Sequence, residues 1–294
     1  MNNYRIIESS LSEIPMVSVA MVTYNHQDFI GEAIESVLMQ ETTFNVELVI
    51  AEDYSTDKTR EIVLDYQSRF PDQIKVILQN RNIGAQKNNI ALLSNLKGKY
   101  VAALEGDDYW TDPLKLQKQV DFLEDNLSYI ACGCYVDIER LGTLEKNSHD
   151  LKNVSLNKTQ LFFEWPFATL STLFRNINLD TFIKFNNGGD LELFLYLSKF
   201  GDFMRLDFVG GVYRYHGSGA NSGSDYYTNS LQHINTKLVA NKNYNLKEDL
   251  QVKRMLNHYI KKELIKIKYL LVGKYEIKKS FKLVQHCLKM YGRI

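Results

Sequence analysis

Carboxylate side chains gather in two short segments of the chain, each directly after an apolar run. The first segment is Glu52-Asp53 and the second is Glu105-Gly106-Asp107-Asp108. Neighbouring carboxylates repel one another unless a cation lies between them. Mg²⁺ and Mn²⁺ prefer oxygen ligands and commonly bridge to substrate phosphates. The second segment therefore indicates a divalent-metal site, with a solvated acidic turn before the next helix as the alternative.

The first segment suggests a nucleoside contact. An acidic residue at a strand end can accept a hydrogen bond from a base or ribose, as in other nucleotide-binding folds, and Asp53 is such a residue. The next residues, Ser55-Thr56-Asp57, supply helix-capping groups. Capping accounts for one of these three but leaves Asp53 without a structural explanation.

Alternating strand and helix patterns position these segments in an α/β sheet. Strands are predicted over 17–22, 46–51, 74–78 and 100–104, and helices over 30–38, after Asp57, over 84–96 and from Asp112-Pro113. This alternation predicts a largely parallel sheet with helices on both faces. Thr23-Tyr24-Asn25 and both acidic segments then fall at the carboxyl edge of the sheet, where such folds bind ligands.

The second half of the chain is less regular. Strands are predicted over 130–138 and 168–174, a helix over 190–200 and a β-hairpin over 203–215. The Gly- and Ser-rich segment 217–224 predicts a mobile loop, and the pattern from residue 225 onward is helical.

The composition is that of a soluble globular protein, with 45% hydrophobic and 24% charged residues. We expect neither a signal peptide nor a transmembrane helix, because no apolar run is suitable. Cys132, Cys134 and Cys287 lack the partners of a zinc site and are odd in number. We interpret them as core thiols of a protein in a reducing compartment, the cytoplasm.

Charge is unevenly distributed although the chain has 35 basic and 35 acidic residues. Residues 253–294 contain 12 Lys and Arg but only two acidic residues. This asymmetry predicts an acidic body and a basic tail with different roles. No G-x-G-x-x-G follows the first strand and no P-loop motif occurs, which argues against dinucleotide dehydrogenases and P-loop NTPases.

Several linked motifs, taken in order, resemble those of family 2 glycosyltransferases, which have the GT-A fold. The motifs are Thr23-Tyr24-Asn25, EDYSTDKT (52–59), RNIGAQKN (81–88) and EGDDYWTDP (105–113), and segments 188–202 and 212–223 are similar to the second half of the same family. The resemblance covers about residues 15–224.

The resemblance implies a Rossmann-like GT-A catalytic domain over 1–224, with a nucleotide-sugar-binding half over about 15–125 and an acceptor half over 126–224. A basic helical extension would occupy 225–294. The implied reaction is an inverting transfer from a nucleotide diphosphate-sugar, often a UDP-sugar, to a hydroxyl acceptor in glycan or polysaccharide biosynthesis. The implied cofactor is Mn²⁺ or Mg²⁺.

The resemblance also implies site residues at matching positions. The donor-binding residues are Thr23, Tyr24, Asn25, Asp53, Asn82 and Lys87. The metal-binding candidates are Glu105, Asp107, Asp108 and His216, with Asp107 as the main ligand and Asp108 as a substitute. Asp190 matches the catalytic base. Two departures are that Glu105 replaces the usual first Asp, and that Gln86-Lys87-Asn88 replaces the usual Ala-Arg-Asn, so that Lys87 stands in for an arginine.

Asp190 and His216 have plainer interpretations when each is taken alone. An Asp after Gly188-Gly189 is more often a helix N-cap, and a His at a strand end is more often structural. Their agreement with the metal motif favours the functional roles. Asp190 would then deprotonate the acceptor opposite the diphosphate and invert the anomeric carbon, while loop 217–224 would exclude water as a lid.

Two alternatives belong to other classes. A sugar nucleotidyltransferase would need a Gly-rich loop with Arg and Lys after the first strand, where this chain has Tyr24-Asn25-His26-Gln27. A non-catalytic nucleotide-sugar-binding protein would keep Asp53 but need neither Asp107 nor Asp190. The expected acceptor is a saccharide, free or lipid-linked, and no nucleic-acid partner is expected. The protein is expected in the cytoplasm. The apolar residues of 253–294 favour packing of the tail on the catalytic domain, and the alternative is that its basic residues also contact the inner face of an anionic membrane.

Overall fold

The computed structural model describes residues 4–147, 150–158, 160–162, 165–185 and 189–216, with isolated positions 233, 236, 237, 254, 258 and 262. The chain divides into two compact units. The first comprises Met1–Leu156, Pro166–Lys184 and Phe200–His216, and the second comprises Asn157–Trp165, Phe185–Lys199 and Gly217–Ile294. The predicted loop 217–224, Cys287 and almost all of the predicted tail lie outside the described residues.

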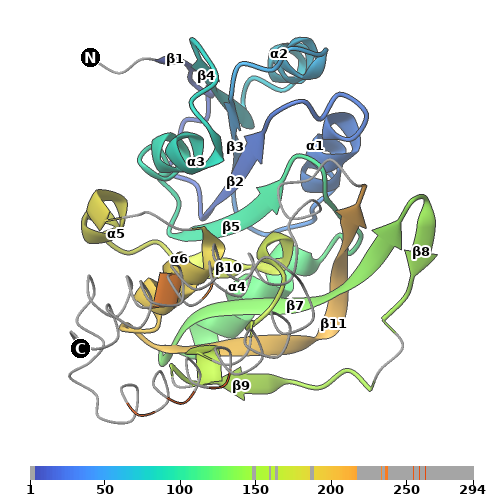
Figure 1. Ribbon diagram of the computed structural model, residues 1–294. Coiled ribbons are helices and arrows are strands. Elements are labelled where there is room, and N and C mark those ends of the chain that lie inside the picture. Colours follow the sequence, from blue (N-terminus) through green and yellow to red (C-terminus); the bar gives the residue numbers. More distant parts are fainter. Residues whose placement is uncertain are drawn as a thin grey trace, which may run out of the picture. The chain divides into compact units, whose positions relative to one another are not determined.

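Four parallel strands form the centre of the first unit, in the spatial order β4-β3-β2-β5 (Figure 1). They are β2 (Val17–Thr23), β3 (Val46–Glu52), β4 (Ile74–Gln79) and β5 (Tyr100–Glu105). Successive apolar side chains such as Val49, Ile50 and Ala51 are completely buried. Burial on both faces is typical of a parallel sheet, and the α/β fold predicted from the sequence is confirmed.

Further strands extend this sheet on both sides. β1 (Tyr4–Ile7) pairs antiparallel with β4. On the other side, β10 (Leu173–Arg175) lies antiparallel between β5 and β7 (Tyr129–Arg140). β11 (Asp202–Tyr215) runs parallel to β7 and carries β6 (Tyr109–Trp110) and β9 (Val154–Leu156), while β8 (Thr143–Glu145) pairs with β7.

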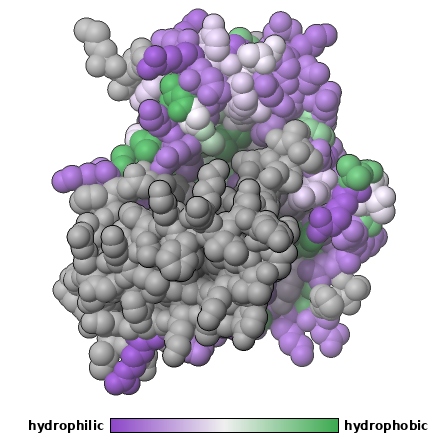
Figure 2. Space-filling view, viewed as in Figure 1, coloured by the Kyte–Doolittle hydropathy of each residue, from purple (hydrophilic) through white to green (hydrophobic). Residues whose placement is uncertain are grey.

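Helices cover the sheet at the predicted places. α1 (Ile30–Leu38) packs against α2 (Thr59–Arg69), α3 (Ala85–Leu93) against β2 and β3, and α4 (Lys115–Asp125) against β7 and β10. A short helix, α5 (Asp180–Phe185), and a 3₁₀ turn, η2 (Thr169–Ser171), complete the described helices of this unit. Hydrophilic residues cover most of the coloured surface over β4, α2 and α1 in Figure 2.

The predicted hairpin over 203–215 is wrong, because these residues form one long strand, β11. The Gly210-Gly211 pair that suggests a turn serves close packing instead. A Cβ atom at Gly210 would lie 2.4 Å from the Cys134 sulfur, and one at Gly211 would lie 2.8 Å from Leu170 Cδ1. The predicted strand over 168–174 is likewise mostly the turn η2, followed by the short strand β10.

The described part of the second unit contains η1 (Gln160–Phe162) and α6 (Asp190–Leu197), which contact each other. Trp165 packs edge-on against Phe194 of α6, with ring centres 5.9 Å apart. Among the described residues of either unit, no helix combines the length and apolar character needed to cross a membrane.

Candidate active site

Three strand ends bring the polar segments of the sequence to one edge of the sheet. In the pairing registers, Thr23 of β2 lies opposite Glu52 of β3, and Val22 of β2 lies opposite Glu105 of β5. Because the three strands are parallel, the loops that follow them leave the sheet at the same edge. The site predicted for this edge is therefore assembled from adjacent loops of the first unit.

Asp53 organises the loop after β4. Its two carboxylate oxygens accept the backbone N–H groups of Ile83 and Gly84, at 2.8 and 2.9 Å. Gly84 has φ +86°, a conformation that favours glycine. Burial raises the pKa of Asp53, and the two backbone hydrogen bonds oppose this rise. Asp53 thus shapes the loop that carries Asn82 and leads into α3, the helix that carries Lys87; both are predicted donor-binding residues and both are exposed here.

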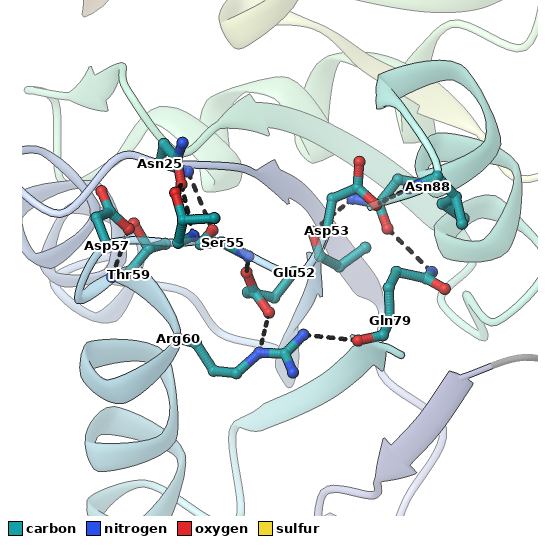
Figure 3. A network of polar contacts seen from close by, with 12 residues as sticks. Asn25, Glu52, Asp53, Ser55, Asp57, Thr59, Arg60, Gln79 and Asn88 are labelled. Atoms are coloured by element: carbon teal, nitrogen blue, oxygen red, sulfur yellow. Dashed lines mark hydrogen bonds and ion pairs between the residues drawn. The ribbon is translucent and has the colours of Figure 1, made fainter. Parts of the chain in front are cut away.

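The loops after β2 and β3 are joined through Asn25 (Figure 3). Asn25 has φ +56°; its backbone N–H donates to Ser55 Oγ at 3.0 Å, and its side-chain oxygen accepts the Thr56 N–H at 2.9 Å. Tyr24 and Tyr54, which adjoin this turn, are 40% and 47% exposed, respectively. Two partly exposed aromatic rings beside the Asp53 loop offer flat surfaces suited to a nucleoside base.

Glu52 has a structural role in the same region. Its buried carboxylate pairs with the Nε of Arg60 and accepts the Ser55 N–H at 2.6 Å. Arg60 also donates to the Gln79 carbonyl at 2.7 Å (Figure 3). The predicted helix cap belongs to Asp57, which accepts the N–H of Thr59, the first residue of α2, at 2.9 Å. The acidic segment therefore contains both scaffold residues and the candidate Asp53.

Asp107 and His216 lie together. Asp107 Oδ2 is 3.0 Å from His216 Nε2, although the two residues are separated by 109 positions. A second ring, that of His26, has its Nε2 3.7 Å from the same oxygen. Burial lowers the pKa of His26, Asp107 opposes this effect, and His216 adds to it. An imidazole that is neutral at neutral pH has a nitrogen available to accept a proton or a metal.

Asp108 has a different environment from its neighbour. Its carboxylate is buried and accepts the backbone N–H of Arg214 at 2.8 Å. Burial, reinforced by the charge of Asp107, raises the pKa of Asp108 to about 8, against the opposing effects of Arg214. Asp108 ties the acidic loop to β11, so the arrangement favours Asp107 over Asp108 as the metal ligand. Glu105 ends β5 and is partly buried.

The Asp107–His216 pair fits a divalent cation. A carboxylate oxygen and an imidazole nitrogen are both ligands that divalent ions accept, and in this pair they lie 3.0 Å apart. The described residues contain no group of three or more His, Cys, Asp or Glu side chains arranged to hold a metal. Of the described residues, Asp107 and His216 would hold a cation here, and Mg²⁺ sites with few protein ligands are commonly completed by substrate phosphates and water.

Gly106 allows the loop to follow this course. A Cβ atom at this position would lie 2.7 Å from Thr23 Oγ1 and 3.0 Å from Ile30 Cδ1. Thr23 Oγ1 also lies 3.3 Å from His26 Nδ1. Thr23, a predicted donor-binding residue, is buried and packs against the acidic loop and His26.

Asp190, the predicted base, is the first residue of α6 and is partly buried. It belongs to the second unit, whereas Asp107 and His216 belong to the first. Its proximity to the metal pair therefore stays a prediction. The predicted lid, residues 217–224, lies outside the described residues.

The sequence patterns did not single out two residues of this site. His26 directly follows the Thr23-Tyr24-Asn25 motif, and Arg214 lies two positions before His216. Alternation along β11 was the available signal for Arg214, because residues two apart on a strand face the same side. The predicted hairpin concealed that signal.

The chain matches the Glycosyl transferase family 2 over residues 18–194, and it belongs to this family. Over 116 residues it is 43% identical to an uncharacterized protein of Mycobacterium tuberculosis, covering 40% of this chain and 34% of that protein. Over 121 residues it is 40% identical to Bacillus subtilis EpsE, whose name places it among glycosyltransferases, covering 40% of this chain and 42% of EpsE. The alignments thus span less than half of the length of these relatives.

Solved structures share the fold at low sequence identity. S. aureus TarS 1–349, in complex with UDP-GlcNAc, superimposes with a TM-score of 0.69 at 19% identity, over 93% of this chain and 81% of that one. A Pyrobaculum calidifontis mannosyltransferase, in complex with GDP-Man and Mn²⁺, gives a TM-score of 0.57 at 14% identity, over 96% and 87% of the two chains. The fold is that of the GT-A glycosyltransferases, as the sequence motifs predicted.

Proposed function

We propose that this protein is an inverting glycosyltransferase that moves a sugar from a nucleotide diphosphate-sugar, a UDP-sugar, to a hydroxyl acceptor in polysaccharide biosynthesis. The observation that carries the proposal is the Asp107–His216 pair, 3.0 Å apart, at the same sheet edge as the Asp53 loop. Family membership supports it. TarS and the mannosyltransferase, whose structures contain UDP-GlcNAc and GDP-Man, support a nucleotide-sugar donor.

In this proposal the residues of the first unit hold the donor. Tyr24 and Tyr54 are partly exposed and would contact the base, and Asp53 fixes the loop that carries Asn82 and leads into α3, where Lys87 lies. Asp107 and His216 would hold Mn²⁺ or Mg²⁺, which stabilises negative charge on a leaving diphosphate when bound. The family resemblance assigns Asp190 as the base that takes the acceptor proton, and attack opposite the diphosphate inverts the anomeric carbon.

The acceptor in this proposal is a saccharide, free or lipid-linked, and the protein works in the cytoplasm. The buried free thiols of Cys132 and Cys134 support a reducing compartment.

Asp107→Ala tests the metal-assisted donor site. Titration calorimetry with UDP and with GDP, each with and without Mn²⁺, should give metal-dependent UDP binding by the wild type and none by Asp107→Ala. Release of UDP from a UDP-sugar should fall at least about 100-fold, because the charge on the leaving group loses its stabilisation.

Asp121→Ala is the matched control, since Asp121 is an exposed aspartate on α4. Its affinity for UDP and Mn²⁺ should equal that of the wild type. Unchanged metal-dependent binding by Asp107→Ala would refute the assignment. Binding without any sugar transfer would favour a non-catalytic binding protein, and pyrophosphate release from UTP and a sugar phosphate would favour a nucleotidyltransferase.

A further inference from the structure

Arg214 is enclosed by groups from several elements around the acidic loop. Its guanidinium pairs with Glu32 of α1 and, through Nε at 3.4 Å, with Glu139 of β7. Its Nη1 donates to the backbone carbonyl of Asp107 at 3.2 Å, and its charge lies 4.1 Å from the ring centre of Tyr109. Only 8% of the residue is exposed. A buried arginine with this many directed contacts is held in one orientation.

The main chain of Arg214 contacts the same loop. Its N–H donates to Asp108 Oδ1 at 2.8 Å, so Arg214 binds Asp107 through its side chain and Asp108 through its backbone. His216 follows two positions later, directly after β11 ends at Tyr215. Arg214 is therefore linked to both residues of the candidate metal pair, to Asp107 by a hydrogen bond and to His216 through the short stretch of chain between them.

We infer that Arg214 is a positioning residue for the metal site, one that fixes the Asp107–Asp108 loop so that the Asp107 carboxylate faces His216. The inference rests on the proposed function, because it assumes that Asp107 and His216 bind the divalent cation. Arg214 itself does not bind the cation. Its positive charge is neutralised by Glu32 and Glu139, which draws α1 and β7 to the loop.

Lysine cannot replace arginine in this role. A guanidinium donates from three nitrogens in a fixed plane, whereas an ammonium is a single point of charge on a flexible chain. Arg214→Lys keeps the charge but cannot reach Glu32, Glu139 and the Asp107 carbonyl at once. The loop then has more freedom, and the cation must restrict that freedom when it binds.

The experiment measures Mn²⁺ affinity directly, by electron paramagnetic resonance of free Mn²⁺ during titration of the full chain, with and without UDP. We expect Arg214→Lys to weaken Mn²⁺ binding by about 10- to 100-fold, the usual effect of removing a group that orients a metal ligand. Saturating Mn²⁺ should restore much of the kcat for sugar transfer, and UDP binding without metal should stay unchanged.

Arg205→Lys is the matched control. Arg205 lies on the same strand, and its Nε donates to the Pro166 carbonyl at 2.9 Å, away from the acidic loop. Arg205→Lys should bind Mn²⁺ as the wild type does. An equal loss of affinity in both variants would overturn the inference, because the effect would then report general damage to β11.

Glu32→Gln covers the case in which Arg214→Lys fails to fold. The Glu32 side chain is 55% exposed, so this change removes one charge from around Arg214 at little risk to the core. We expect weaker Mn²⁺ binding here too, by a smaller factor. Wild-type affinity in Glu32→Gln and in any folded Arg214→Lys would overturn the inference. A wild-type protein that binds no Mn²⁺ would instead contradict the proposed function.

Discussion

At the scale of single residues, the acidic loop gives two adjacent carboxylates different surroundings. Asp107 faces two imidazoles, whereas Asp108 is buried against the backbone of Arg214. The pair follows β5 in the turn before β6, and it supplies one group to the candidate site and one to the scaffold. Glu52 and Asp53 divide in a similar way, with Glu52 bound to Arg60 and Asp53 holding the loop after β4.

Asp190→Asn tests the general base. The change keeps the shape of the side chain and removes the proton acceptor. UDP-sugar binding should survive, and transfer should fall by about 10²- to 10⁴-fold, the usual contribution of general-base catalysis. Calorimetry for binding and a UDP-release assay with acceptor for transfer would measure the two effects separately.

Asp180→Asn is a suitable control, because Asp180 is likewise the first residue of a helix, α5. It should change neither binding nor transfer. Near-wild-type transfer by Asp190→Asn would reduce Asp190 to a helix-capping residue. Glu192, which lies two positions further on α6, would then be the candidate to test next.

The sequence pointed to the candidate site residues but not to their contacts. Asp53, Asp107 and His216 stand out because charged or titratable groups directly follow apolar strands. The same pattern cannot reveal that Asp53 accepts two backbone N–H groups from a loop 30 positions away. Nor can it reveal the partners of Arg214, since these depend on which strands become neighbours in the sheet.

At the scale of elements, the four parallel strands and their helices were predictable because each obeys a local period. The strand β11 was not predictable, because its Gly210-Gly211 pair resembles a turn when the neighbouring strands are unknown. β6 and β10 are also too short for a periodic signal, with two and three residues. Long-range pairing determines such strands, and no local pattern encodes it.

The packing of α4 against β7 encloses an unusual lysine. Lys115 is completely buried, with its Nζ 2.8 Å from Gln119 Oε1 and 4.0 Å from the ring centre of Trp110. Burial lowers the pKa of Lys115 from its ordinary 10.5 to about 8, although Cys134, Cys132 and Asp112 oppose this effect. A buried amine with a lowered pKa makes stability depend on pH.

The sign of that dependence follows from the proton count. Between pH 8 and 10.5 the unfolded chain keeps a proton on Lys115 that the folded chain releases. The free energy of unfolding should therefore rise with pH from about 8, with a slope of up to about 1.4 kcal/mol per pH unit relative to Lys115→Met. Urea denaturation of both proteins at pH 7.5, 8.5 and 9.0 would measure it.

Lys118→Met provides the comparison, because Lys118 is on the same helix and its side chain is 44% exposed. Its stability should follow the pH dependence of the wild type. The thiols of Cys132 and Cys134 are present in all three proteins, so their titration cancels in the differences. Parallel curves for Lys115→Met and the wild type would contradict the lowered pKa.

At the scale of the whole molecule, the uneven charge remains the main feature without a structural explanation. The basic residues of 253–294 lie almost entirely outside the described residues, and their apolar neighbours, such as Leu270 and Phe281, need a surface to bury against. Packing on the rest of the protein would bury these apolar side chains. Binding to an anionic membrane would also engage the lysines, each of which contributes about 1 kcal/mol of binding free energy near the surface.

Co-sedimentation with vesicles separates these alternatives. The full chain should bind vesicles containing anionic lipid at low salt and release them at high salt, because surface charges are screened. A chain ending at Val252 should not bind, and vesicles of neutral lipid serve as the control. If the full chain ignores anionic vesicles, the tail is a packing element and a soluble acceptor becomes the better expectation.

The sheet order also determines what a ribosome must make before the protein is complete. β5 ends at Glu105, but its outer neighbour β10 begins only at Leu173. The hydrogen bond from the Arg214 N–H to Asp108 needs 106 residues to be made after Asp108. At about 5–20 residues per second, synthesis of those residues takes about 5–20 seconds. Until β10 is made, the apolar strand β5 is an open edge onto which a foreign strand can add. Shielding by a chaperone during synthesis is therefore most valuable while residues 106–173 emerge.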